Sequence, residues 1–432
     1  MIDVAKKSEA GGSKLPEIQV LRGISILAVL FCHLSILWTL IDKAPKKITM
    51  PLFLGVDIFF ILSGFVITNS LLRDQFSGMR FFIKRVFRLT PVILIFLALT
   101  FGLNSYFQAS SHSPEIKTLF SVSQGSFIEQ ALSILGGYFV LRKTNGAYYN
   151  GAMWTLSVED QFYAALALIC LLANGLRSAK ARLAGPIVLS AATAFYLMIF
   201  TVRMCILAGV SLDVQAPEIL MYFTSRRFDL LALGIMLAFA EPKIRPRLQN
   251  AFQDSGPFVA PFLLLIPVGL AAIAESAVNL ADAPVLHGLV FPITGASFGL
   301  LVLLAANGLA FPKQNGWVWR TLLFLGDRSY TIYVFHFPAM VIAWLVFNLV
   351  FPNALARVVG WDVSQAVITI LILLPACDLI YRKVELPLAE YGRRLAHSLG
   401  TLKTEGRPAL QIEPAAATLP ISTESCSGSK AA

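Results

Sequence analysis

The sequence predicts an all-α polytopic membrane protein, and two observations support this. Of the 432 residues, 56% are hydrophobic and only 14% are charged, whereas an ordinary soluble domain has roughly 25% charged residues. The apolar residues also gather in runs of about 20, the length that a helix needs to cross the hydrocarbon core of a bilayer. Composition therefore excludes a soluble globular protein and a disordered one.

About ten transmembrane helices are expected, because only helices and closed barrels satisfy their backbone polar groups in lipid. A shorter apolar run at 129–141 is interpreted as a re-entrant or interfacial helix. The ten expected spans are 19–40, 52–72, 89–107, 158–176, 184–206, 219–240, 256–274, 286–308, 321–350 and 362–381.

Basic residues are concentrated in the connections on one side of these spans, which the positive-inside rule assigns to the cytoplasm. Both termini are therefore expected in the cytoplasm. The expected organisation is an N-terminal segment at 1–18, a membrane domain at 19–385 and a tail at 386–432. The tail should be largely disordered, because its end is rich in Pro, Ala, Ser and Thr.

Cysteine spacing and net charge exclude several other classes of protein. The five cysteines are scattered, and their spacing predicts neither a disulfide framework nor a metal site. The net charge of +10 would suggest nucleic acid for a soluble chain. Here the charge reflects membrane topology, so the lipid bilayer is the expected partner and nucleic acid is not.

Arg22 and His33 are the first ionisable residues within a predicted span. Their separation of eleven residues is three helical turns, so both lie on one helix face about 16 Å apart. One interpretation is an anion-binding arginine near the cytoplasmic edge and a titratable base deeper in the membrane. The alternative is that Arg22 anchors the helix end and His33 is a buried, hydrogen-bonded imidazole.

Asp57 lies near the outer end of the second span, where a buried carboxylate needs a partner or a function. A carboxylate beside a histidine commonly accepts its ring proton and orients the ring. The hypothesis is that Asp57 orients His33 in this way.

A basic stretch precedes the third span. It is typical of a cytoplasmic flank that binds lipid headgroups. However, Arg85 and Arg88 are three residues apart and face the same way on a helix, so a phosphate clamp is the functional alternative.

Four further candidates lie at or within later spans. Glu159, beside Asp160, is expected at the outer mouth of the fourth span, where it would also favour the helix dipole. Arg226, Arg227 and Asp229 lie within an apolar span, and neutralisation of an arginine by the aspartate within that span is the plain interpretation. Tyr330, Tyr333 and His336 follow at three-residue steps, a spacing more typical of packing than of chemistry. Trp154 begins the motif that contains Glu159.

In this order, the motifs resemble the acyltransferase-3 family of integral-membrane O-acyltransferases. The family's signature of an arginine, ten residues and a histidine corresponds to Arg22 and His33, and its acidic pair to Glu159 and Asp160. Thr155 replaces the usual serine. The matching segments are LRGISILAVLFCHL, GVDIFFILSGFVIT, FFIKRVFRLTP, MWTLSVEDQFY, SRRFDLLALGIMLA, GDRSYTIYVFHFP and VELP.

The resemblance implies transfer of an acyl group, often acetyl, to a hydroxyl of an exported glycan or lipid-linked saccharide, such as lipopolysaccharide or exopolysaccharide. The donor would be a cytoplasmic co-substrate such as acyl-CoA, with no bound cofactor. The implied location is the bacterial inner membrane, with multiple spans. Many relatives also carry a C-terminal SGNH hydrolase-type domain, which does not follow the last span here, so the chemistry is expected of the membrane domain or a partner.

The site residues implied by this resemblance fall into three groups. His33, Asp57 and Glu159 would be catalytic, with His33 as general base or as carrier of the acyl group. Glu159 would also help to bind the acceptor at the outer mouth. The expected donor-binding residues are Arg22, Arg85 and Arg88, and the candidates to stabilise the oxyanion or complete the site are Trp154, Arg227, Tyr330, Tyr333 and His336.

Two other function classes stay open at this point. Buried charges also line transport paths, so a transporter or flippase of an acyl group or lipid-linked sugar is the main alternative. The lack of visible inverted repeats argues against it. A scaffold subunit without chemistry would leave the buried His33 and Asp57 unexplained.

Overall fold

The computed structural model confirms the predicted all-α fold. Within its described residues every regular element is helical, and eight helices are long and apolar enough to cross a membrane. The described residues are 15–42, 50–112, 117, 120–136, 151–175, 184–207, 227–276, 284–312, 316–350 and 363–401.

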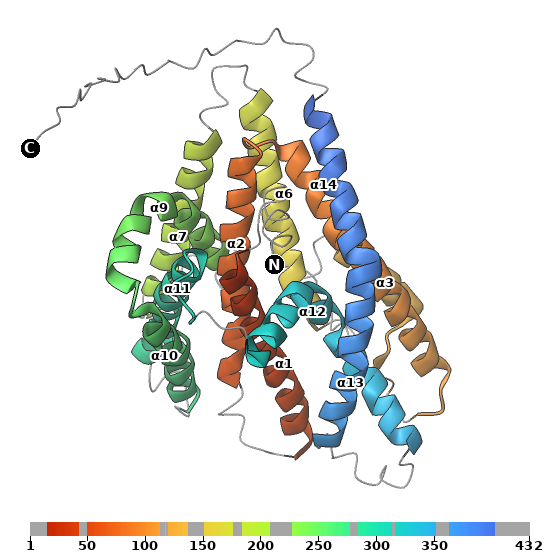
Figure 1. Cartoon of the computed structure of the whole chain (residues 1–432). Helices are drawn as coiled ribbons and strands as arrows, with labels where there is room; N and C mark the ends of the chain where they lie inside the picture. Colours follow the sequence, from red (N-terminus) through yellow and green to blue (C-terminus); the bar gives the residue numbers. More distant parts are fainter. Residues whose placement is uncertain are drawn as a thin grey trace, which may run out of the picture.

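The helices form one bundle in which α1, α2 and α12 are central (Figure 1). Helices α7, α9, α10 and α11 lie on one side of this centre, and α3, α13 and α14 lie on the other. The helices are α1 (Pro16–Asp42), α2 (Gly55–Arg73), α3 (Gly78–Ala109), α5 (Gln124–Leu135), α6 (Met153–Gly175), α7 (Ala184–Leu207), α9 (Phe228–Phe252), α10 (Gly256–Ser276), α11 (Pro284–Ala306), α12 (Trp317–Val350), α13 (Val363–Ile380) and α14 (Leu386–Thr401).

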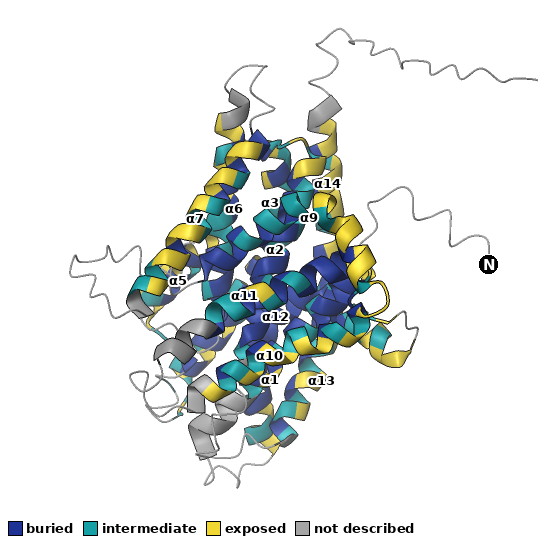
Figure 2. Cartoon of the chain, turned by 90° about the vertical axis from the view of Figure 1, so that its left-hand side faces the viewer, coloured by how far each residue is buried: buried dark blue, intermediate teal, exposed yellow. Residues whose placement is uncertain are grey.

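Burial follows this arrangement. The dark, buried residues concentrate on α2 and α12, whereas the outer helices expose large apolar side chains to the surroundings (Figure 2). A short 3-10 turn, Met50–Leu54, precedes α2, and a π-helical turn, Tyr381–Glu385, joins α13 to α14. An apolar exterior around a core that contains polar groups is the arrangement expected of a helical membrane protein.

Two predicted spans are not among the eight. The span predicted at 219–240 corresponds to α9, which is described only from its start at Phe228 and contains charged residues such as Asp229 and Glu241. The span predicted at 286–308 corresponds to α11, whose described apolar part, Val290–Ala306, is shorter than the others.

The third span begins earlier than predicted. Helix α3 starts at Gly78 rather than near residue 89, so Arg85 and Arg88 belong to the helix and are only half-exposed. The basic stretch was predicted as a flank because four cations interrupt the apolar pattern. Long side chains with charged ends nevertheless continue a helix readily, because arginine and lysine have high helix propensity.

The short apolar run and the tail are described in part. The run at 129–141 overlaps α5, a helix of 12 residues that is too short to span a bilayer. The first part of the predicted tail is α14, an amphipathic helix that packs along α3. Residues from 402 onward, where disorder is predicted, lie outside the described residues.

Two glycines let α1 and α12 approach to backbone contact. A Cβ atom at Gly326 would lie 1.9 Å from the carbonyl oxygen of Gln19, and one at Gly23 would lie 2.3 Å from that of Leu322. No side chain fits at either position, so the two helices meet along their backbones, as small residues allow in membrane bundles.

The α2–α9 pair is built in the same way. A Cβ at Gly64 would lie 2.1 Å from the carbonyl oxygen of Leu231, and one at Gly234 would lie 2.3 Å from that of Ile61. These contacts hold the start of α9 beside α2.

We predict that Gly326→Ala will lower the free energy of unfolding by about 1–3 kcal/mol or more, because the new methyl group overlaps the α1 backbone and forces the helices apart. Thermal unfolding in detergent, followed by tryptophan fluorescence, measures the change. Gly269→Ala in α10 is the matched control, since a Cβ there meets no atom within 4 Å among the described residues. Equal stability of the two variants would contradict the assigned contact.

Candidate functional site

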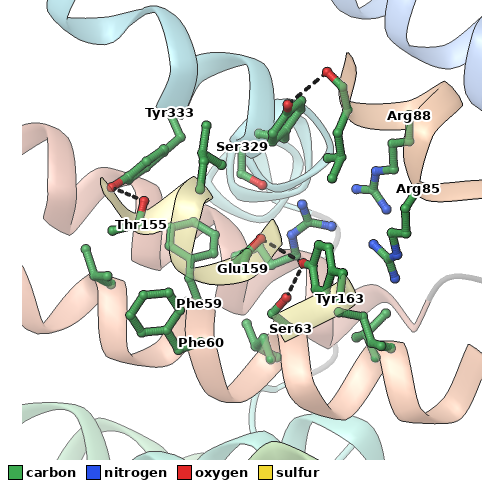
Figure 3. A pocket seen from close by; sticks show the side chains of 18 residues that line it. Phe59, Phe60, Ser63, Arg85, Arg88, Thr155, Glu159, Tyr163, Ser329 and Tyr333 are labelled. Carbon is green, nitrogen blue, oxygen red and sulfur yellow. Dashed lines mark hydrogen bonds between the residues drawn. The ribbon is translucent and has the colours of Figure 1, made fainter. Parts of the chain in front are cut away.

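A pocket lies where α1, α2, α3, α6 and α12 meet, and most of the predicted site residues line it (Figure 3). Its empty volume is about 770 Å³, part of which is open to the surroundings. Apolar side chains such as Phe59 and Phe60 form much of the wall. The polar lining residues are Arg22, Ser63, Arg85, Arg88, Thr155, Glu159, Tyr163, Ser329, Tyr330 and Tyr333.

Three arginines from two helices face this pocket. Figure 3 shows Arg85 and Arg88 pointing toward Glu159 and Tyr163. The guanidinium of Arg85 lies over the Tyr163 ring at 5.1 Å, and Nε of Arg88 is 3.9 Å from Oε1 of Glu385, at the limit of an ion pair. Arg22 forms neither a hydrogen bond nor an ion pair with the part of the chain that the structure describes. The arginine charge is therefore neutralised only in part, which suits an anionic ligand.

Glu159 is held within the same pocket. The hydroxyl of Tyr163 donates to its Oε2 at 2.7 Å, and the same hydroxyl is 2.7 Å from Oγ of Ser63. The expected position at an outer mouth stays a prediction, and the structure adds that Glu159 lines one pocket with the arginines. The first turns of α6 pack on α2 and α12, and this packing brings the carboxylate close to the arginine charges.

The two tyrosines of α12 use their hydroxyl groups as well as their rings. Tyr330 donates to the backbone oxygen of Leu89 at 3.0 Å. Tyr333 accepts from Oγ1 of Thr155 at 2.8 Å, which ties α12 to the first turn of α6. Both tyrosines line the pocket, so they contribute to helix packing and also shape the cavity.

His33 and His336 form a hydrogen-bonded pair next to Tyr333. Nε2 of His336 is 2.9 Å from Nδ1 of His33, and the two ring planes are nearly parallel, inclined by 14°, with centroids 4.9 Å apart, so the rings meet edge to edge. The Phe337 ring packs on both. The Tyr333 and His336 rings are 5.5 Å apart, so the pair lies one helical turn beyond the end of the pocket rather than in its lining.

Asp57 is fully buried and pairs with Arg227, which donates from Nη1 to Oδ2. The predicted Asp57–His33 contact is therefore wrong. A guanidinium carries a permanent charge that neutralises a buried carboxylate, and a neutral imidazole cannot do this. Arg227 itself precedes α9 in a left-handed conformation, with φ of 58°, and its guanidinium lies over the Phe53 ring at 5.0 Å.

The predicted neutralisation within this span is wrong for Arg227, and Arg226 lies outside the described residues. Asp229 accepts hydrogen bonds from both terminal nitrogens of Arg203 on α7. Each arginine thus has its own carboxylate on a neighbouring helix. Arg227 does not line the pocket, and this removes the geometric support for an oxyanion role.

Two aromatic residues of α6, Trp154 and Tyr163, differ from what the sequence predicts. Trp154 packs edge-on against Phe60, with ring centroids 6.1 Å apart, and does not line the pocket. Sequence reasoning missed Tyr163, although its position four residues after Glu159 on one helix face was a visible signal.

Comparison with known proteins gives a clear family match. A family model described as an acyltransferase domain matches residues 15–382. Peptidoglycan O-acetyltransferase OatA of Listeria monocytogenes is 25% identical over an alignment of 400 positions that covers 88% of this chain and 56% of that protein. The "Putative peptidoglycan O-acetyltransferase YrhL" of Bacillus subtilis is 27% identical over 398 positions, with the same coverages. O-acetyltransferase OatA of Staphylococcus aureus is 23% identical over 391 positions, which cover 88% of this chain and 58% of that protein.

The chain thus spans little more than half the length of these curated relatives. No solved structure matches it.

We predict strong coupling between Asp57 and Arg227. Arg227→Gln leaves a buried carboxylate without its counter-charge and should lower the free energy of unfolding by about 3–5 kcal/mol. Adding Asp57→Asn should recover most of this loss, because the double variant buries no charge. Thermal unfolding of both single variants and the double variant measures the coupling. Arg394→Gln, at an exposed ion pair on α14, is the control and should change stability by about 1 kcal/mol or less. Additive single effects would contradict the pair.

Proposed function

The chain belongs to the acyltransferase-3 family, and on this premise we propose that it is a membrane O-acyltransferase. The family and the multi-pass membrane location expected from the sequence are confirmed. The proposed reaction moves an acyl group, acetyl by analogy with the names of the relatives, from acyl-CoA to a hydroxyl of a cell-wall glycan. The observation that carries the proposal is the pocket with its three incompletely neutralised arginines.

The arginine pocket suits a donor that carries several phosphates. Guanidinium groups bind phosphate through paired, charge-assisted hydrogen bonds, which strengthen where water is excluded. Arg22 lies near the start of α1 and Arg85 near the start of α3, and both helix starts are on the side that basic residues assign to the cytoplasm. Acyl-CoA would therefore enter from the cytoplasm and direct its thioester toward Tyr333 and the histidines.

The proposed chemistry places His33 as general base. As the acceptor oxygen attacks the thioester carbonyl, Nε2 of His33 removes the hydroxyl proton, and a C–O bond forms. The tetrahedral intermediate then collapses, the C–S bond breaks, and the leaving thiolate takes the proton from the imidazolium. The Tyr333 hydroxyl, at the end of the pocket nearest the histidines, is the proposed donor to the oxyanion.

Glu159 is assigned to the donor pocket rather than to a separate acceptor site. Its carboxylate accepts a hydrogen bond from Tyr163, and the Arg85 guanidinium lies over the ring of that tyrosine. The acid therefore holds the wall on which an arginine is positioned, and it limits the net charge of an otherwise apolar cavity.

The direct test is acyl transfer in membrane vesicles. Vesicles containing the protein are incubated with acetyl-CoA labelled in the acetyl group, and alkali-labile label is measured in peptidoglycan and in other exported glycans. We expect label that falls by about 100-fold or more with His33→Ala, the usual contribution of a general base. Unchanged labelling in this variant would exclude the role of His33.

The same experiment separates the transporter alternative. Absence of label from acetyl-CoA and from longer acyl-CoA donors, together with continued movement of a lipid-linked saccharide across the vesicle membrane, would overturn the acyltransferase proposal.

We predict that Arg85→Gln raises the KM for acetyl-CoA by about 10–100-fold, because it removes a charge-assisted hydrogen bond of about 1.5–3 kcal/mol. Initial rates at varied acetyl-CoA concentration provide the measurement. Arg80→Gln is the matched control, because Arg80 lies on the same helix but does not line the pocket. An equal effect of both substitutions would contradict a specific donor site.

A further inference from the structure

The hydrogen bonds of the histidine pair determine which ring nitrogen of each histidine carries a hydrogen. His336 is fully buried and His33 is half-buried. No ion pair of the described residues includes either ring. A charged imidazole without a counter-ion is costly in an apolar interior, so both rings are neutral at rest and each carries one ring hydrogen.

His336 has its hydrogen on Nδ1. This atom lies 2.7 Å from the backbone oxygen of Tyr333. A carbonyl oxygen can only accept a hydrogen bond, so Nδ1 of His336 is the donor. Nε2 of the same neutral ring is then bare and can only accept.

His33 must supply the hydrogen between the two rings. Its Nδ1 lies 2.9 Å from the bare Nε2 of His336, so Nδ1 of His33 is protonated. The single ring hydrogen of His33 is thereby used, and its Nε2 has a free lone pair. Two hydrogen bonds thus run in series from Nδ1 of His33 to Nε2 of His336 and from Nδ1 of His336 to the backbone oxygen of Tyr333. They leave Nε2 as the reactive nitrogen of His33.

We propose that His336 is the positioning residue for His33. It sets the tautomer and the ring orientation of His33, a function that a carboxylate usually performs beside a catalytic histidine. The carboxylate expected from the sequence, Asp57, is paired with Arg227 instead. This inference rests on the proposed function for its catalytic meaning, but the tautomers themselves can be measured independently.

A neutral partner has a specific chemical consequence. When Nε2 of His33 takes the acceptor proton, the new charge is shared only with a neutral imidazole through the Nδ1–Nε2 hydrogen bond. A carboxylate would hold that charge more strongly. The imidazolium of His33 therefore returns its proton readily to the leaving thiolate, and the pair regains its resting tautomers.

Two substitutions at position 336 separate positioning from packing. His336→Phe keeps a ring of similar size against Phe337 and His33 but removes the acceptor. His336→Gln keeps an acceptor on a flexible chain. We expect His336→Phe to lower kcat by about 10–100-fold with KM for acetyl-CoA within about twofold, and His336→Gln to retain more of kcat. Equal loss in both variants, or a change confined to KM, would overturn the positioning role.

Nitrogen-15 NMR of histidine-labelled protein in lipid nanodiscs reads the tautomers directly, with the signals assigned by their loss in His33→Phe and His336→Phe. We expect both rings to be neutral with Nδ1 protonated, and His33 to shift toward the Nε2-protonated form in His336→Phe. An Nε2-protonated His33 in the intact protein would overturn the inference, even if acyl transfer occurs. The expected tautomers without acyl transfer to any glycan would instead overturn the proposed function and retain the assigned hydrogen-bond chain.

Discussion

The backbone contact between α1 and α12 determines the geometry of the whole site. Because Gly23 and Gly326 have no side chains, the two helices touch along their length. This contact directs Arg22 into the pocket and brings His33 within hydrogen-bond distance of His336. The arginine pocket and the histidine pair are thus two levels of one helix interface, and a change in the spacing of α1 and α12 would disturb both.

Partner charges divide the arginines of this bundle into two groups. Arg203 and Arg227 each pair with a carboxylate on a neighbouring helix and hold α2, α7 and α9 together. The arginines of the pocket, by contrast, have weak neutralisation and face open space. An apolar environment makes an unpaired charge costly, so a ligand that carries negative charge would stabilise this second group.

The sequence was sufficient for the fold class and for part of the site. Hydropathy located the helices, and helical spacing predicted that Arg85 and Arg88 share a face, because both signals are local. The partner of Asp57 could not be predicted, since Arg227 lies 170 residues away and several cations were available. The histidine pair joins residues that lie 303 positions apart in the sequence. Glycines in α1 and α12 allow this contact, but their positions in the sequence do not predict it. That Glu159 lies in one pocket with the arginines could not be predicted, because the neighbours of α6 depend on tertiary packing.

In the proposed mechanism, the arginine pocket holds the phosphates of an acyl donor and directs its reactive end toward the histidines. A cryo-EM structure in nanodiscs with acetonyl-CoA, a ketone analogue that cannot transfer its acyl group, tests this most directly. We expect phosphate density within hydrogen-bond distance of Arg22, Arg85 or Arg88 and the ketone beside Tyr333. Density for the analogue at another surface, with this pocket empty, would contradict it.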